Sequence, residues 1–188
     1  PENQRNFYTE NIIYLPGSYF PRDNNRKIGK KKFTRKDLNI SENSFVFCNF
    51  NNSYKITFEE FEIWMKLLKK IDNSTLLLLE TNNEMKKNLY FEAVKFKINE
   101  DRIMFIKKTI FEDHLSRHSL ADLFLDTFNY NAHTTAVDAL WTGLPIITKP
   151  GKSFSSRVCG SLLKFFGLDE LILKNKEEYY NKALELAE

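Results

Sequence analysis

Two short apolar runs on either side of an amphipathic segment constrain the fold of this chain more than any other feature. Leucine and phenylalanine fill most of 120–126, and a second apolar run covers 144–148. Between the two runs, residues 134–142 carry apolar side chains at helical spacing: Ala136, Val137, Leu140 and Trp141. Buried strands joined by one helix are expected to be parallel, with a right-handed crossover. The stretch therefore predicts a β-α-β unit.

The same alternation of strand and helix begins earlier in the chain and continues after this unit. Apolar runs of strand length predict further strands at 44–50, 74–80 and 102–106. Helical spacing predicts helices at 57–70, 83–97, 153–166 and 175–187, and a short one within 107–117. Thr57 and Glu60 have capping-box spacing. This order predicts an α/β fold with three layers and a Rossmann-like, mostly parallel sheet. The last helix is expected to pack on the outside of the domain.

The first part of the chain lacks this alternation. Residues 1–43 are expected to be irregular, apart from a short strand at 11–15. The basic stretch 27–36 is interpreted first as a solvated loop and second as a surface for an acidic partner. We therefore expect a linker at 1–43 and one domain at 44–188. Because the chain starts with proline rather than methionine, it is expected to be a piece of a longer protein.

Polar side chains with the chemistry of a phosphate site lie at the predicted start of the helix over 134–142. The N–H groups of a first helical turn have no intrahelical acceptor, and the helix dipole is positive there. His133, Thr134 and Thr135 would add an imidazole and two hydroxyls. Asp138 shares their face and could accept ribose hydroxyls. In a competing interpretation Thr134 is an N-cap and His133 a solvated loop residue. The residues alone leave both interpretations open.

Other candidate side chains follow other predicted strands. Lys55 lies just after the strand at 44–50, where ligands of parallel sheets bind, and its ammonium could reach a diphosphate. His114 and Arg117 are three residues apart in the predicted short helix, so both point the same way. They could instead be a solvated pair of cations. Arg157, in the first turns of the helix at 153–166, is expected to form an ion pair rather than support a phosphate site.

Composition and motifs exclude several classes of function. The net charge is only +3, with 28% charged residues of both signs, which argues against a nucleic-acid-binding protein. No apolar run approaches membrane-spanning length, and Cys48 and Cys159 follow no metal or redox spacing. A reducing, cytoplasmic setting is expected. The chain has no G-x-G-x-x-G or P-loop motif, so dehydrogenase and NTPase functions have no support.

Three motifs in this chain carry a resemblance to a known family. They are F-C-N-F-N-N-S-Y-K-I at 47–56, H-L-S-R-H-S-L-A-D-L-F-L-D-T at 114–127, and D-T-F-N-Y-N-A-H-T-T-A-V-D-A-L-W-T-G-L-P-I-I-T at 126–148. Together they resemble the O-GlcNAc transferase and SPINDLY-type protein O-glycosyltransferases, which are linked to tetratricopeptide repeats. The resemblance implies the carboxy-terminal, nucleotide-sugar-binding lobe of a two-lobed GT-B glycosyltransferase. It further implies transfer of N-acetylglucosamine from UDP-GlcNAc to Ser or Thr of a protein acceptor, without a metal, and an upstream catalytic lobe.

The resemblance also implies a set of site residues. Lys55 and His133 would stabilise the departing diphosphate and are the catalytic candidates. The nucleotide-binding candidates are Asn52, His114, Arg117, His133, Thr134, Thr135 and Asp138. In the family, the histidine matching His114 packs against uracil and the arginine matching Arg117 lies at the base edge. Asn52 replaces the glutamine of many members, and its shorter reach ranks it below Lys55.

One departure from the family pattern keeps other functions open. Phe111 stands where the animal enzymes carry a lysine near the ribose. A protein O-fucosyltransferase using GDP-fucose would keep Lys55 and His133 but change the surroundings of the base. A nucleotide-sugar epimerase of the same fold would act on a small molecule and need no repeats. A binding module with a decayed site is the third alternative, and retention of the polar site residues argues against it.

Overall fold

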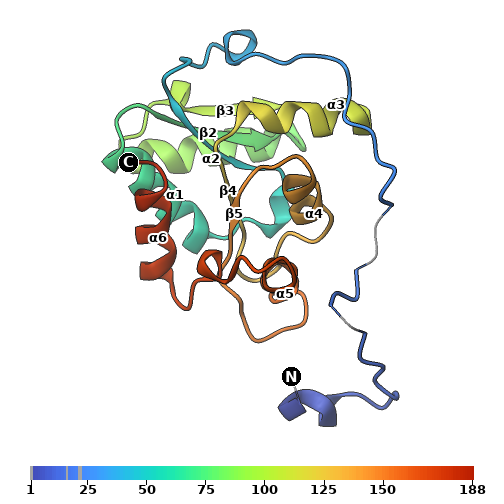
Figure 1. Cartoon of the computed structure of the whole chain (residues 1–188). Coiled ribbons are helices and arrows are strands. Elements are labelled where there is room, and N and C mark those ends of the chain that lie inside the picture. Colours follow the sequence, from blue (N-terminus) through green and yellow to red (C-terminus); the bar gives the residue numbers. More distant parts are fainter. Residues whose placement is uncertain (1, 16, 21–22) are drawn as a thin grey trace.

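The fold is centred on a five-stranded parallel sheet (Figure 1). The computed structural model describes residues 2–15, 17–20 and 23–188. The strands are β1 (Phe45–Asn49), β2 (Ser74–Leu79), β3 (Ile103–Ile106), β4 (Leu123–Leu125) and β5 (Ile146–Ile147), in the spatial order β3-β2-β1-β4-β5. Every neighbouring pair is parallel, and Phe47 of β1 lies in register with Leu76 on one side and Leu123 on the other. The predicted parallel sheet is confirmed.

Helices cover both faces of this sheet, as the prediction of three layers requires. They are α1 (Phe58–Lys70), α2 (Asn83–Lys95), α3 (Phe111–Ser116), α4 (Thr134–Trp141), α5 (Val158–Phe165) and α6 (Lys176–Glu185). Helices α1 and α6 pack together on one face, and α4 and α5 pack together on the other (Figure 1). The strands read as continuous apolar runs because both faces of the sheet are buried. The middle of β1, from Val46 to Cys48, is at most 1% exposed.

The first turn of α1 is tied to the loop that follows β4. The predicted capping box is present, with Thr57 and Glu60 bonded to each other's backbone. Glu60 is fully buried, and its second carboxylate oxygen accepts a hydrogen bond from the Phe128 N–H at 2.6 Å. Helix α6 is also hydrogen-bonded to this region, since the Tyr179 hydroxyl donates to the Asp126 carbonyl at 3.0 Å. Tyr179 is fully buried, so α6 contributes to the core and does not lie only on the outside as predicted.

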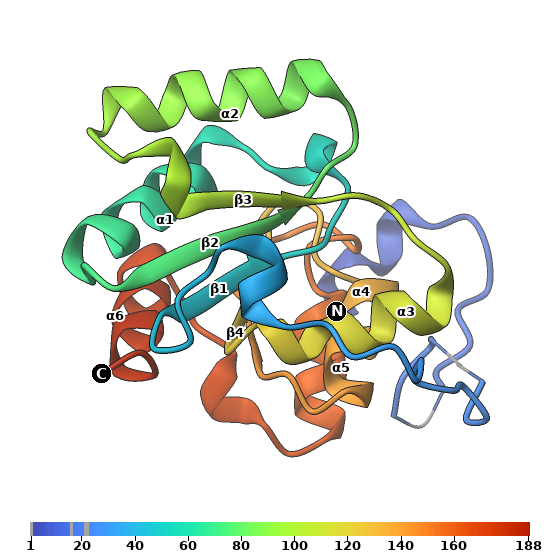
Figure 2. The same ribbon diagram turned by 90° about the horizontal axis from the view of Figure 1, so that it is seen from above.

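The later part of the segment before β1, from Arg26 to Leu38, contacts the domain. In Figure 2 the blue chain that leads to β1 passes beside α3, and the Gly29 N–H donates to the Glu112 carbonyl at 2.9 Å. Arg35 donates twice to the Asp122 carboxylate, at 2.7 and 2.8 Å, and once to the Ser44 carbonyl at 2.8 Å. The prediction of a solvated basic loop is therefore wrong for Arg35. Residues 11–15 form no strand, and 3-10 turns occur at Glu2–Phe7 and Arg35–Leu38.

Two elements are shorter than the sequence predicts, and local hydrogen bonding explains both. The strand expected at 120–126 begins only at Leu123, because Arg117–Leu120 continues α3 as a 3-10 turn. The helix expected at 153–166 begins only at Val158. Before it, the Ser153 hydroxyl bonds the Ser156 N–H and hydroxyl, and the Gly151 N–H donates to the Ser156 carbonyl at 2.8 Å. Serine hydroxyls that bond nearby backbone favour such turns over helix.

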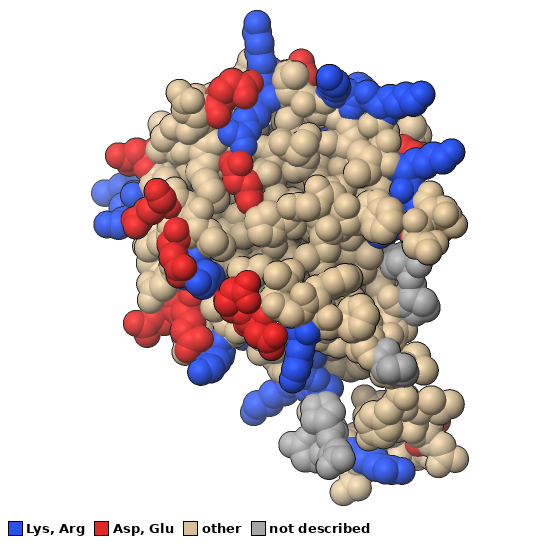
Figure 3. All heavy atoms as spheres, viewed as in Figure 1, with Lys and Arg blue, Asp and Glu red and all other residues tan. Residues whose placement is uncertain are grey.

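The face shown in Figure 3 carries no large patch of one charge. Acidic and basic side chains are mixed along its left and lower edges, and its centre is uncharged. On this face, the described residues therefore form no continuous basic surface of the kind that binds nucleic acids. Within the described part of the chain, no helix combines the length and apolar character needed to cross a membrane.

Candidate functional site

The candidate site lies where the strand order of the sheet reverses. The chain leaves β1 towards β2 on one side, and the neighbouring β4 leads to β5 on the other. Ligands of open parallel sheets bind beyond the carboxyl ends of the strands at such a switch point. The loop after β1 carries Lys55, and the loop after β4 carries His133. The structure brings both side chains against the ring of Tyr130, which lies in the second loop.

Lys55 is held in place by the loop that follows β4. Its ammonium donates to the Asn131 carbonyl at 2.9 Å and lies 4.0 Å from the centroid of the Tyr130 ring. Burial lowers the pKa of Lys55 to about 8, and the nearby charge of Asp126 offsets part of that shift. A partly dehydrated ammonium interacts more strongly with a phosphate than a fully solvated one. Lys55 is therefore placed and polarised as an anion-binding group.

His133 is the N-cap residue of α4, with φ −108° and ψ −84°, and its side chain makes no capping bond. Its Nε2 lies 3.1 Å from the Ser155 carbonyl, which can only accept, so Nε2 carries the proton in the neutral ring. Nδ1 is then an acceptor and needs a second proton to donate to an anion. Burial lowers the pKa of His133, and the charge of Lys55 lowers it further. Anion binding through Nδ1 is thus coupled to proton uptake.

The two threonines of α4 have different environments. Thr134 is exposed and is the first helical residue, so the interpretation of Thr134 as the N-cap is wrong. The Thr135 hydroxyl donates to the Asn51 side-chain oxygen at 2.5 Å, and the Asn51 amide donates to the Thr127 hydroxyl at 3.2 Å. Asn51 and Thr127 are buried. This buried network connects the end of β1 to the first turn of α4, which fixes the amino end of the helix.

A buried carboxylate closes the loop between β4 and α4. One oxygen of Asp126 accepts from the N–H groups of Thr127 and Ala132, at 2.8 and 2.6 Å. The other oxygen accepts from the Thr148 hydroxyl at 2.6 Å. Complete burial raises the pKa of Asp126 to about 6, although these three hydrogen bonds act in the opposite direction. Asp126 thereby sets the shape of the loop that presents Tyr130 and His133.

Asp138, predicted to accept ribose hydroxyls, already has a partner within the chain. Its carboxylate lies 2.5 Å from the Arg26 guanidinium, and both side chains are at most 6% exposed. Arg26 also lies 4.9 Å from the centroid of the Trp141 ring. The pair fastens the segment before β1 to α4. In this arrangement the carboxylate serves the fold, and its role towards a ribose stays a prediction.

His114 and Arg117 lie together, as their spacing predicts. They line a cavity of about 230 Å³, with Leu79, Lys108, Thr109 and Phe111. The Arg117 guanidinium lies 2.9 and 3.2 Å from Nδ1 of His114. A guanidinium only donates, so Nδ1 accepts and Nε2 carries the proton. Burial, His118 and Arg117 together lower the pKa of His114 to about 3, so the ring is neutral and offers an N–H donor.

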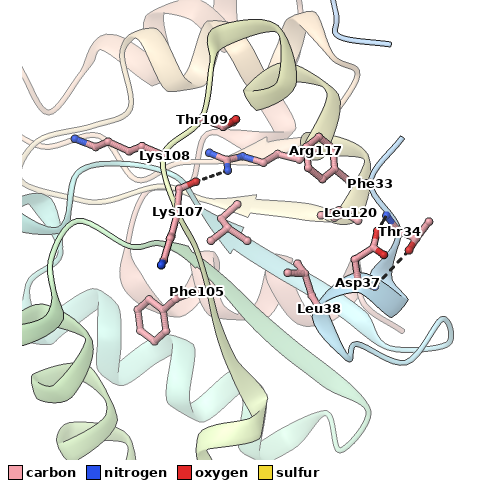
Figure 4. A pocket seen from close by; sticks show the side chains of 11 residues that line it. Phe33, Thr34, Asp37, Leu38, Phe105, Lys107, Lys108, Thr109, Arg117 and Leu120 are labelled. Carbon is pink, nitrogen blue, oxygen red and sulfur yellow. Dashed lines mark hydrogen bonds between the residues drawn. The ribbon is translucent and has the colours of Figure 1, made fainter. Parts of the chain in front are cut away.

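Arg117 also borders a second cavity, shown in Figure 4. That cavity has a volume of about 320 Å³ and lies between Phe33 and Leu38 on one side and the end of β3 on the other. The Arg117 guanidinium donates to the Lys107 carbonyl, which fixes the arginine between the two cavities (Figure 4). The smaller cavity, beside His114, has a mixed apolar and polar lining.

Two predicted residues have other roles than expected. Asn52 is exposed at the start of a 3-10 turn (Ser53–Lys55), and its side chain makes no capping bond. Its carbonyl accepts the Lys55 N–H at 3.0 Å, so it shapes the turn that carries the lysine. Arg157 donates to the Lys152 carbonyl. The ion pair predicted for Arg157 is not among the described contacts.

Sequence reasoning missed several residues that build the site. Tyr130 carries no motif of its own, although its position inside the third motif was a usable signal. Asn51 and Asp126 lie inside the first and third motifs, and neither is among the predicted site residues. His118 is 1% exposed, and its ring lies 4.9 Å from that of His114 and 5.0 Å from that of Phe50. Nothing in its spacing indicated that it would back the nucleobase cavity.

Comparison with known proteins reveals relatives over the whole domain. The sequence model of "Glycosyl transferase family 41" matches residues 24–188. A UDP-N-acetylglucosamine–peptide N-acetylglucosaminyltransferase of Caenorhabditis elegans is 37% identical over 81% of this chain and 13% of its own length. The SEC protein of Arabidopsis thaliana is 36% identical over 100% of this chain and 20% of its own length. The chain thus spans about a fifth or less of the curated relatives it matches.

Solved structures with a similar fold come from nucleotide-sugar enzymes. An O-GlcNAc transferase from Thermobaculum terrenum superimposes with a TM-score of 0.85 at 26% identity, covering 100% of this chain and 35% of the other. The C-terminal CMP-Kdo binding domain of WaaA from Acinetobacter baumannii gives a TM-score of 0.56 at 10% identity, covering 81% and 84% of the two chains. The second likeness shows the fold alone.

Proposed function

Because this chain belongs to glycosyl transferase family 41, we propose that it is the donor-binding lobe of a protein O-glycosyltransferase. The donor would be UDP-GlcNAc and the acceptor a Ser or Thr hydroxyl of a protein, in line with the name of the Caenorhabditis elegans relative, a UDP-N-acetylglucosamine–peptide N-acetylglucosaminyltransferase. The two buried free cysteines fit a cytoplasmic protein, which we propose as its location. Residues 1–43 would connect this lobe to an upstream catalytic lobe and repeats.

The observation that carries the proposal is the convergence of Lys55 and His133 on one ring beside the amino end of α4. Both side chains follow strands that meet at the switch point of the sheet. The neutral His114 donor and the fixed guanidinium of Arg117 line a separate cavity beyond β3. The site thus combines donors for a diphosphate with a cavity for a base, as a nucleoside diphosphate sugar requires.

The geometry supports an electrostatic mechanism for sugar transfer. When the bond from the sugar to the diphosphate breaks, negative charge grows on the departing UDP. The Lys55 ammonium, a doubly protonated His133 and the first N–H groups of α4 would stabilise that charge. These donors are fixed before the reaction by the Asn131 carbonyl, the Ser155 carbonyl and the capping geometry of the helix. The acceptor hydroxyl would be positioned by residues outside this lobe.

A transfer assay with the full-length protein tests the proposal. We expect incorporation of N-acetylglucosamine from UDP-GlcNAc into a Ser- and Thr-containing peptide. Removing one fixed donor of this type costs on the order of 10²–10³ in rate, so Lys55→Ala and His133→Ala should each lower turnover by about that factor. Lys152→Ala, at an exposed lysine outside the site, is the matched control and should change turnover less than twofold or so.

The alternatives give different results in the same assay. Transfer from GDP-fucose and not from UDP-GlcNAc would move the protein to the fucosyl branch of the family. Release of a free sugar or an epimerised donor without peptide modification would favour an epimerase-type enzyme. Equal losses in Lys55→Ala, His133→Ala and Lys152→Ala, with the fold intact, would show that the diphosphate site has been placed wrongly.

A further inference from the structure

We propose that Tyr130 is a positioning residue of the diphosphate site, whose ring holds the Lys55 ammonium and the His133 imidazole at one place. This inference rests on the proposed donor site. Tyr130 touches both catalytic candidates, and neither the family match nor its sequence spacing assigns it a role. Its task would be to fix the position of both donors before the nucleotide arrives.

The first contact is that of Tyr130 with Lys55. The Lys55 nitrogen lies 4.0 Å from the centroid of the Tyr130 ring, well inside the distance at which a ring face attracts a cation. The same ammonium donates to the carbonyl of the next residue, Asn131. The ring and the carbonyl belong to adjacent residues. One short stretch of backbone therefore sets both the distance of the Lys55 ammonium from the ring and the direction of its hydrogen bond. A lysine side chain otherwise has many rotamers, and fixing it in advance saves that entropy on binding.

The second contact is that of Tyr130 with His133. The two rings are stacked, with centroids 4.8 Å apart and an interplanar angle of 26°. The stack and the hydrogen bond from Nε2 to the Ser155 carbonyl together fix the orientation of the imidazole. A ring face also favours a cation, so Tyr130 compensates part of the repulsion that arises when His133 takes up a second proton beside Lys55.

Tyr130 itself is anchored through its backbone. Its carbonyl accepts a hydrogen bond from the buried Thr127 hydroxyl at 2.6 Å. Thr127 also accepts from Asn51 at the end of β1, so the loop is fixed to the sheet. The ring is 38% exposed, which leaves its surroundings open to a nucleotide. Among the described residues, the Tyr130 hydroxyl has no hydrogen-bond partner, so the ring and not the hydroxyl should matter.

A comparison of Tyr130→Ala and Tyr130→Phe in the full-length protein tests the proposal. The first readout is the calorimetric affinity for UDP, and the second is the rate at which acetic anhydride acetylates Lys55 in the free protein, measured by mass spectrometry. We expect Tyr130→Ala to weaken UDP binding about tenfold, the scale of a partly dehydrated cation–ring contact, and to speed Lys55 acetylation several-fold or so. Tyr130→Phe should keep both within about twofold.

Two controls distinguish positioning from a general structural role. Tyr54→Ala removes a neighbouring ring that is 70% exposed and lies 6.3 Å from Tyr130, and it should change neither readout. In a Lys55→Met background, Tyr130→Ala should cost only about threefold, because the lysine share of the contact is already lost. A full tenfold loss of UDP affinity in that background would overturn the proposal. Changes in UDP affinity and acetylation rate as large in Tyr130→Phe as in Tyr130→Ala would also overturn it.

The two readouts also separate this inference from the proposed function. If the native protein does not bind UDP, the donor-site proposal fails. The acetylation rates would still decide whether the Tyr130 ring holds Lys55, since they are measured without nucleotide. An acetylation rate that is the same in the native protein and in Tyr130→Ala would overturn the positioning role.

Discussion

At the scale of single residues, protonation governs what this site can bind. Lys55 and His133 both contact Tyr130, and burial lowers the pKa of each. The charge of Lys55 disfavours a second proton on His133, and a bound anion would offset that effect. A nucleoside diphosphate supplies such an anion. The site should therefore bind its ligand together with a proton.

The pH dependence of UDP binding follows from the lysine. Lys55 is charged below its pKa of about 8 and loses its charge as pH rises through that value. Loss of the lysine charge alone should lower the affinity for UDP about tenfold between pH 7 and pH 9, and proton uptake by His133 would make the fall steeper. Calorimetry over this range checks the prediction. Lys55→Met is the matched control and should give a flatter profile, and an equally steep profile in that variant would exclude Lys55 as the titrating group.

Residue-scale roles were only partly predictable from the sequence. The sequence predicted site roles for Lys55, His114, Arg117 and His133, because each follows a strand of a parallel sheet within a family motif, and those roles stay predictions. The sequence could not show that Arg26 would form an ion pair with Asp138, since the two residues are 112 positions apart. Nor could it show the contact of Tyr130 with Lys55. Partnerships between distant residues depend on loop geometry, which hydrophobic periodicity does not encode.

At the scale of elements, the ion pair of Arg26 with Asp138 fastens the segment before β1 to α4. Helix α4 supplies the first-turn N–H groups of the candidate site, so this pair helps to hold the helix that carries those groups. Removal of one member of a buried ion pair leaves the other charge without its partner. The segment before β1 is therefore part of the domain's stability, and not a passive connection.

We expect Arg26→Ala to lower the free energy of unfolding by about 3 kcal/mol. The substitution removes the guanidinium that compensates the buried charge of the Asp138 carboxylate. Denaturant unfolding followed by circular dichroism measures this change. Lys27→Ala, an exposed neighbour, is the matched control and should change stability by at most about 0.5 kcal/mol. A loss below about 1 kcal/mol in Arg26→Ala would show that the pair does not fasten the segment.

Element boundaries were less predictable than element types. All five strands of the sheet and the helices between them were expected, because buried parallel strands are continuous apolar runs. The starts of β4 and α5 were placed several residues too early. In both places local hydrogen bonds form turns that apolar spacing does not reveal, from the 3-10 turn at Arg117–Leu120 to the serine network at 153–156.

At the scale of the whole molecule, the fold and the family are established, and the sequence predicted both. A five-stranded parallel sheet with the order β3-β2-β1-β4-β5 places the ends of β1 and β4 side by side. That topology explains why the motif at 47–56 meets the distant motifs of 114–148 at one edge of the sheet. The chain spans about a fifth of its plant relatives, and the proposed transfer reaction would also use residues outside this chain.

The central claim is that this edge of the sheet binds a nucleoside diphosphate through its diphosphate and base. Calorimetric titration of the 188-residue chain with UDP, GDP and AMP, repeated with His133→Ala, tests it most directly. We expect UDP to bind best and His133→Ala to weaken UDP binding by about tenfold or more. AMP binding as tightly as UDP, or UDP binding unchanged by His133→Ala, would contradict it.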